Sequence, residues 1–219
     1  MESKVTAVFT SYNRLDLLKV TIDTFNKVNT YPLKEIIIIE DSAIPSVHEQ
    51  LKREYPDYKL ILNETNIGLP ASIDKAFAHV KTPYVFHSED DFEYIKSGFI
   101  EPSIKIMESN NMIMQVWISN RHKQPIDPEG VVLDDIIYDM VSIHGMHDFW
   151  HGFSFIVSVR SMRVYEESKP WAQWSERLDP GSVQECKIGE ELFKRGYRGA
   201  CLRGIPYCEH TGTARTTFR

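Results

Sequence analysis

The stretch YVFHSEDDF, residues 84–92, runs from an apolar segment directly into three consecutive carboxylates. Residues 84–86 predict a short strand, and acids that follow a strand lie at the carboxyl edge of a sheet, where open α/β folds bind ligands. Like charges this close repel, so we expect a cation to hold them together. A divalent ion with oxygen ligands, which also bridges to nucleotide phosphates, is the usual solution. The alternative is an ordinary acidic turn that faces water.

Composition narrows the class of protein. The chain has 219 residues, 42% of them hydrophobic, and no Pro/Gly/Ser-rich linker divides it, so we expect one domain. The formal net charge of −6 argues against a nucleic acid polymer as partner. No apolar run approaches the ~20 residues of a transmembrane segment, and no signal-peptide core is visible. Three cysteines without metal-site spacing fit reduced, buried thiols, so we expect a soluble, cytoplasmic protein.

Strands and helices alternate along the first half of the chain. The patterns predict strands at 5–9, 35–39, 59–62 and 84–86, and helices at 15–28, 46–55 and 70–80. Such alternation is typical of a mostly parallel sheet, in which right-handed crossovers place the C-terminal ends of the strands along one edge. We therefore expect four segments far apart in the sequence to converge: Thr10-Ser11, Glu40-Asp41, Asn63 and Glu89–Asp91.

The second half is less regular. We expect helices at 98–109 and 183–195, the latter closed by Gly196, and strands at 112–118 and 153–159. Residues 120–149 are polar, contain Pro and His, and show weak periodicity. We expect a loop there that covers a site.

Four landmarks in the first half resemble glycosyltransferases of the GT-A fold, and most closely the large inverting family 2. Residues 8–14, VFTSYNR, resemble the family's first strand and turn. Residues 36–42 resemble its second strand with the acid that reads the nucleobase, and 66–69 its Asn-x-Gly segment. Glu89–Asp91 stands in the place of its metal-binding Asp-x-Asp motif. The resemblance implies an α/β fold of Rossmann-like GT-A type, a mostly parallel central sheet with helices on both faces.

The C-terminal half matches more loosely. Relatives carry an acidic pair about three helical turns before a Gly-Tyr, and here Gln184-Glu185 precedes Gly196-Tyr197. Gln184 departs from the pattern and leaves Glu185 as the implied catalytic base. The segment 210–212, His-Thr-Gly, resembles a late motif that adds a metal ligand. The resemblance thus implies a single GT-A domain over 1–219, with a nucleotide-binding half (about 1–118) and an acceptor-binding half (about 119–219).

The implied reaction is transfer of a sugar from a nucleotide-sugar donor, with UDP as the expected nucleotide, to a hydroxyl acceptor that is a glycan or is linked to protein or lipid. A divalent cation would stabilise the leaving diphosphate, and an imidazole ligand favours Mn²⁺ over Mg²⁺. The expected metal ligands are Asp91, His210 and Glu89. The expected donor-binding residues are Thr10, Tyr12, Arg14, Asp41, Asn66 and Asp90.

Several alternatives stay open at the level of sequence. Asp41 is also a plausible helix N-cap, Tyr12 a plausible core residue, and Glu185 a plausible solvated residue of a first helical turn. A metal-dependent nucleotidyltransferase or a nucleotide-sugar hydrolase would use a similar acidic strand end, although the turn at 10–14 lacks the glycines of nucleotidyltransferases. A non-catalytic carbohydrate-binding module, a domain of a larger enzyme and a protein peripheral to a membrane are further options.

Overall fold

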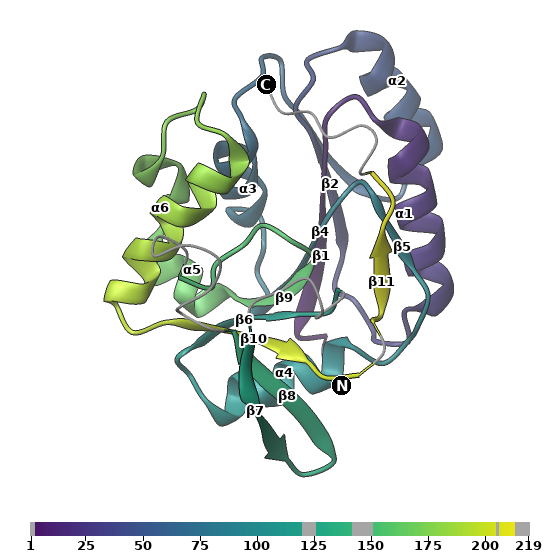
Figure 1. The fold of residues 1–219 in the computed structure, drawn as a ribbon. Coiled ribbons are helices and arrows are strands. Elements are labelled where there is room, and N and C mark those ends of the chain that lie inside the picture. Colours follow the sequence, from purple (N-terminus) through teal and green to yellow (C-terminus); the bar gives the residue numbers. More distant parts are fainter. Residues whose placement is uncertain (1–2, 120–125, 142–150, 205, 213–219) are drawn as a thin grey trace.

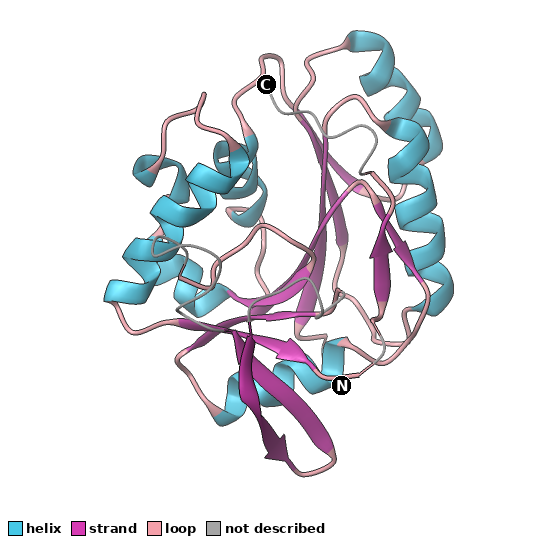
Figure 2. Cartoon of the chain, viewed as in Figure 1, coloured by secondary structure: helices cyan, strands magenta, loops and turns pink. Residues whose placement is uncertain are grey.

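The computed structural model describes residues 3–119, 126–141, 151–204 and 206–212 (Figures 1 and 2). Its first elements are β1 (Val5–Ser11), α1 (Leu15–Val28), β2 (Ile36–Glu40), α2 (Pro45–Glu54), β3 (Lys59–Leu62), α3 (Leu69–Phe77), β4 (Tyr84–Glu89), β5 (Phe92–Tyr94) and α4 (Ile100–Ser109). Then follow β6 (Ile113–Trp117), β7 (Ile126–Leu133), β8 (Ile136–Val141), β9 (Ser158–Ser161), α5 (Met162–Ser168), the 3-10 helix η2 (Trp171–Trp174), α6 (Gly181–Lys194), β10 (Arg198–Leu202) and β11 (Cys208–His210).

A nine-stranded sheet forms the centre of the molecule, in the order β3-β2-β1-β4-β9-β6-β10-β8-β7. Strands β3, β2, β1 and β4 pair in parallel, as do β6 and β10. Only β9 and β8 run against the other strands, so the predicted mostly parallel α/β sheet is confirmed. A separate two-stranded sheet joins β11 to β5 beside α1 (Figure 1).

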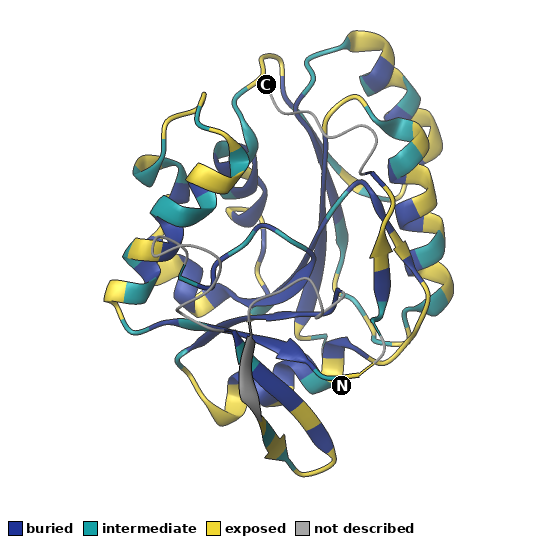
Figure 3. Cartoon of the chain, viewed as in Figure 1, coloured by how far each residue is buried: buried dark blue, intermediate teal, exposed yellow. Residues whose placement is uncertain are grey.

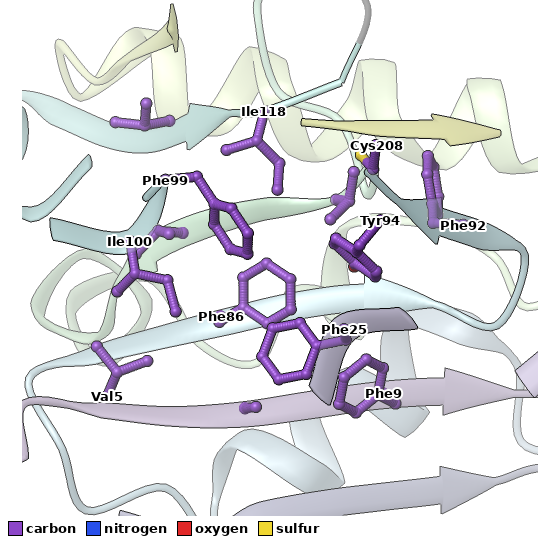
Figure 4. Packing of buried hydrophobic residues seen from close by; sticks show 14 of the residues in the cluster. Val5, Phe9, Phe25, Phe86, Phe92, Tyr94, Phe99, Ile100, Ile118 and Cys208 are labelled. Atoms are coloured by element: carbon purple, nitrogen blue, oxygen red, sulfur yellow. The ribbon is translucent and has the colours of Figure 1, made fainter. Parts of the chain in front are cut away.

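Helices cover both faces of the sheet because side chains along β1 alternate between two cores. Phe9 faces α1, where its ring lies 5.3 Å from that of Phe25, and Phe25 stacks on Phe86 of β4 at 4.9 Å (Figure 4). Val8 belongs to the opposite core, together with Ile73 of α3 and residues of α5 and α6. The buried strands therefore lie between helices whose outer faces are exposed (Figure 3).

Local sequence explains the buried face of α1 and the end of α6. In α1, residues Leu18, Ile22 and Phe25 recur at helical spacing and are buried. The predicted cap at Gly196 is confirmed: its φ is +89°, and its N–H donates to the carbonyl of Phe193 at 2.8 Å. This left-handed residue ends α6 in the manner of a Schellman motif.

The irregular region differs from expectation. Residues 126–141 form the hairpin of β7 and β8 at the edge of the sheet and not a loop, whereas 120–125 and 142–149 lie outside the described residues. The hairpin turns at Asp134-Asp135, where Asp134 has a φ of +52°, a conformation that Asp tolerates. The predicted strand at 153–159 begins only at Ser158, and α5 and η2 were not predicted. None of the described helices is long and apolar enough to cross a membrane.

Candidate active site

The predicted convergence of strand ends is present at the carboxyl edge of the parallel strands. Asp41 follows β2, and its N–H donates to the carbonyl of Ser11 at 3.1 Å. Asn63 follows β3, and its side-chain amide donates to Asp41 Oδ1 at 2.8 Å. Tyr12, after β1, donates its backbone N–H to Asp90 Oδ2 at 3.2 Å. Residues from four parts of the sequence therefore meet at one edge of the sheet.

A cation does bridge the acidic cluster, and in this structure it is an arginine. Arg14 donates through Nε to Asp90 Oδ2 at 3.2 Å and through Nη1 to Asp91 Oδ2 at 2.8 Å, and Nη2 bonds to Asp90 Oδ1. Asp90 is fully buried, and burial raises its pKa to about 7 although Arg14 opposes the shift. Arg14 therefore offsets part of the repulsion that the sequence implies.

Thr21 of α1 fixes the turn that carries the acids. Its hydroxyl donates to the carbonyl of Asp90 at 2.8 Å and accepts the N–H of Phe92 at 3.1 Å. This role of Thr21 was not predicted from the sequence. The signal was a hydroxyl residue that falls on the buried face of α1, next to Ile22.

The second metal-ligand candidate reaches Asp91 through the small sheet. Strand β11 pairs with β5 so that His210 lies opposite Phe92, which places His210 Nε2 at 3.2 Å from Asp91 Oδ2. Thr211 donates its backbone N–H to the carbonyl of Asp91 at 2.8 Å. Burial alone would raise the pKa of Asp91, but the hydrogen bond to His210 and the charge of Arg14 outweigh it and lower that pKa.

Gly212 lies directly against the same aspartate. A Cβ added at this position would meet Asp91 Oδ2 at 2.1 Å and Asp91 Cβ at 2.6 Å. Only glycine allows the segment 210–212 to lie this close to the carboxylate. In this chain the glycine of the His-x-Gly segment is therefore required for steric reasons.

The donor set around Asp91 fits a divalent cation that also binds phosphates. Asp91 Oδ1 is buried without a hydrogen-bond partner in the structure as described, and a carboxylate with an imidazole suits Mn²⁺. Burial, followed by the charges of Asp91 and Glu185, raises the pKa of Glu89 to about 8. Within the described ranges no three His, Cys, Asp or Glu side chains gather into a group that could hold a metal ion. An ion held by Asp91 and His210 would therefore need phosphate oxygens to complete its coordination.

Glu185 points inward from the first half of α6. Its Oε1 accepts hydrogen bonds from the Ser154 hydroxyl and the Phe155 N–H, both at 2.7 Å. Burial raises its pKa, and its Oε2 accepts no hydrogen bond from the part of the chain described. The solvated-turn alternative for Glu185 is therefore wrong. Glu190 and Glu191 instead both pair with Lys194 at 2.9 Å on the outer side of the helix.

The predicted donor-binding residues differ in accessibility. Tyr12 is 36% exposed, and Asn66 is also exposed, with Oδ1 accepting a hydrogen bond from Arg177 at 3.1 Å. Thr10 is buried, and its hydroxyl lies 3.4 Å from His87 Nε2. Their roles toward a donor remain predictions.

Asp41 organises the segment that follows β3. It accepts hydrogen bonds from Ile67 N–H on Oδ1 at 2.9 Å and from Gly68 N–H on Oδ2 at 2.8 Å, in addition to that of Asn63. It does not cap α2, whose N-cap is Ile44 without a side-chain cap. The N-cap alternative is therefore wrong, and the nucleobase role of Asp41 remains a prediction.

Glu40 is a residue whose role the sequence did not reveal. It is fully buried, and its Oε1 accepts the N–H groups of Asn13 at 3.0 Å and Ser42 at 2.9 Å. Asn13 has a φ of +53°, so Glu40 stabilises a turn that leads from Tyr12 to Arg14. The feature of the sequence that could have indicated this role is an acidic residue at the end of a buried strand.

The mostly parallel sheet, with acids and a tyrosine at its strand ends, has the arrangement expected of the GT-A glycosyltransferase class. The chain belongs to this class through glycosyl transferase family 2, whose family model matches residues 6–156. A search of curated proteins finds no match.

Solved structures support the same fold. S. aureus TarS 1-349 in complex with UDP has a TM-score of 0.66 at 14% identity, over 94% of this chain and 59% of that one. Mannosyltransferase PcManGT from Pyrobaculum calidifontis, in complex with GDP-Man and Mn²⁺, has a TM-score of 0.64 at 13% identity, over 99% and 59%. The chain thus spans about three fifths of the length of these proteins.

Proposed function

We propose that this chain transfers a sugar from a nucleotide-sugar donor, with UDP as the nucleotide, to a hydroxyl acceptor with inversion at the anomeric carbon. One observation carries the proposal: Glu185 is a carboxylate held through Oε1 by two hydrogen bonds, and its charge raises the pKa of Glu89 at the end of β4. This electrostatic link supports a candidate base near the candidate diphosphate site, as a single displacement requires.

Different residues of the chain would carry out different parts of the transfer reaction. Glu185 would take the proton of the acceptor hydroxyl as its oxygen attacks the anomeric carbon. Asp91 and His210, with Glu89 as a third ligand, would hold Mn²⁺ or Mg²⁺, which neutralises the charge that develops on the leaving diphosphate. Arg14 sits against the same carboxylates and would contribute positive charge on that side.

Donor recognition would use the ends of β1 and β2, next to the acidic cluster. Tyr12 has the exposed ring that stacking on a nucleobase needs, and Asp41 orders the segment containing Asn66. The complexes of TarS with UDP and of PcManGT with GDP-Man and Mn²⁺ support a nucleotide-sugar and a divalent cation for a fold of this kind. The acceptor would be a glycan or a protein- or lipid-linked hydroxyl.

The cellular setting is part of the proposal. Cys186 and Cys208 are free thiols, which fits the reducing conditions of the cytoplasm. We place the activity there, either in a separate protein or in one domain of a larger enzyme.

The experiment combines binding with turnover. Melting temperatures are measured with UDP-, GDP- and dTDP-sugars, with and without Mn²⁺, because a ligand of the folded state raises the melting temperature. We expect a Mn²⁺-dependent rise with a UDP-sugar. Glu185→Gln should keep this rise and reduce transfer by about 10²- to 10⁴-fold, whereas the outward-facing Glu190→Gln should transfer normally. If Glu185→Gln both binds the donor and transfers sugar as the unaltered protein does, Glu185 is not the base.

A further inference from the structure

A buried arginine lies beneath the candidate base. Arg160 of β9 is 2% exposed, and its guanidinium carbon lies 5.5 Å from the ring of Phe153 and 5.9 Å from that of Trp171. Its Nη2 donates to the carbonyls of Ser154 at 2.9 Å and Ile156 at 3.1 Å. Nε and Nη1 are buried and have no hydrogen-bond partner within the described parts of the chain.

Such a residue is costly for folding. A guanidinium taken out of water needs a carboxylate in contact or a full set of acceptors, and Arg160 has neither among the residues that the structure describes. The acids that act on it electrostatically are Glu185, the candidate base, and Glu89 of the acidic cluster. Arg160 is therefore linked electrostatically to the candidate active site.

Hydrogen bonds connect Arg160 to Glu185 through one short turn. Arg160 holds the carbonyls at both ends of residues 154–156, and within that turn the Ile156 N–H donates to the Ser154 hydroxyl at 3.2 Å. The same turn supplies both hydrogen bonds that Glu185 Oε1 accepts, from Ser154 Oγ and Phe155 N–H. Fixing the turn therefore fixes the orientation of the Glu185 carboxylate.

The same nitrogen of Arg160 also contacts β4. Nη2 lies 3.3 Å from His87 Nδ1, and His87 Nε2 lies 3.4 Å from the hydroxyl of Thr10. His87 belongs to β4, the strand that ends in Glu89. The guanidinium thus contacts both the turn that holds the base and the strand that carries the acidic cluster.

We propose that Arg160 is a positioning residue that sets the place of the Glu185 carboxylate relative to the acidic end of β4. This inference rests on the proposed function of Glu185. Arg160 neither gives nor takes a proton in the reaction: the acceptor proton goes to Glu185, and Arg160 holds the turn on which Glu185 rests. Substrates do not touch it, because it is buried behind Phe153 and Trp171.

The test is a mutant cycle on the full chain with a UDP-sugar and Mn²⁺. We expect Arg160→Met to lower kcat by about 10²-fold, the cost of a small misplacement of a reacting group, while the KM for the donor and the Mn²⁺-dependent melting shift stay unchanged. Arg160→Lys keeps the charge and one donor nitrogen and should recover part of the loss. In a Glu185→Gln background, Arg160→Met should cause no further loss, because two residues that act as one unit are not additive.

The control removes a less buried arginine that pairs with the β7–β8 hairpin. Arg203 of the segment after β10 pairs with the buried Asp139 of the hairpin, so Arg203→Met should lower stability without changing kcat. Should Arg160→Met not fold, Arg160→Lys carries the same cycle.

The outcomes separate this inference from the proposed function. If Glu185→Gln transfers sugar normally, the proposed base is wrong. If Glu185→Gln is inactive but Arg160→Met keeps its kcat, or lowers the residual rate of Glu185→Gln by the same factor, the positioning role alone is overturned.

Discussion

Replacing Gly212 with alanine tests whether the C-terminal segment must lie against Asp91. The new methyl carbon would stand 2.1 Å from Asp91 Oδ2, whereas ordinary van der Waals contact begins at 3.4 Å. Either the segment or the carboxylate must therefore move by about 1.3 Å, which is the difference between these two distances. A shift of ~1 Å at reacting groups can cost about 10² in rate, so we expect a loss of transfer of that order. Overpacking should also cost about 1–3 kcal/mol of stability.

The assay measures three quantities for Gly212→Ala and for a control. These are the melting temperature without ligand, its rise with UDP and Mn²⁺, and the rate of sugar transfer. A chain of this size should melt roughly 2–4 °C lower per kcal/mol lost. Gly181→Ala is the control, because a Cβ at Gly181 meets nothing within 4 Å, and it should melt at the same or a slightly higher temperature with full activity.

One result would refute the steric argument. If Gly212→Ala binds UDP with the same Mn²⁺ dependence as the unaltered protein and transfers sugar at the same rate, then the contact with Asp91 does not shape the site. If it loses the metal dependence while remaining folded, the pairing of β11 with β5 is part of the metal site.

Three further predictions address other parts of the molecule. Asp41→Ala leaves three hydrogen-bond donors without their acceptor. We therefore expect urea unfolding to show a stability loss of about 1–3 kcal/mol, together with weaker UDP binding. Unchanged stability and unchanged binding would contradict the role given to Asp41. In metal-free protein the pKa of Glu89 is raised, so the folded state keeps a proton that the unfolded state loses near pH 4.5. The free energy of unfolding should therefore fall as the pH rises from about 4.5 to 8. If Glu89→Gln shows the same fall of stability with pH, this prediction is wrong. The thiol of Cys186 should react with an aromatic disulfide before those of the buried Cys201 and Cys208, and simultaneous reaction of all three in native protein would argue against the packing.

The sequence was informative where periodicity and strand ends coincide. Residues 15–28 were predicted as a helix and form one with the same bounds, because apolar side chains recur there at helical spacing. The meeting of Asp41, Asn63 and Asp90 could be inferred because parallel strands share one edge. These features depend on local pattern and on a general rule of topology, both of which are visible in one sequence.

The second half was less predictable for physical reasons. The β7–β8 hairpin has an exposed face, on which Val132 is 69% exposed, and its two-residue turn lacks the glycine that usually marks such turns. Arg160 was missed because a charge within an apolar strand has no local partner in the sequence. Its contacts to residues 154–156 and to His87 exist only after the turn and β4 come together.

The pairing of β11 with β5 has a consequence for biosynthesis. Thr211 and Asp91 are separated by 120 positions, and His210 joins Asp91 only when the last described strand docks. A nascent chain that has emerged only through β10 holds the acidic cluster without its imidazole. Translation thus delays assembly of the Asp91–His210 pair until β11 has been made.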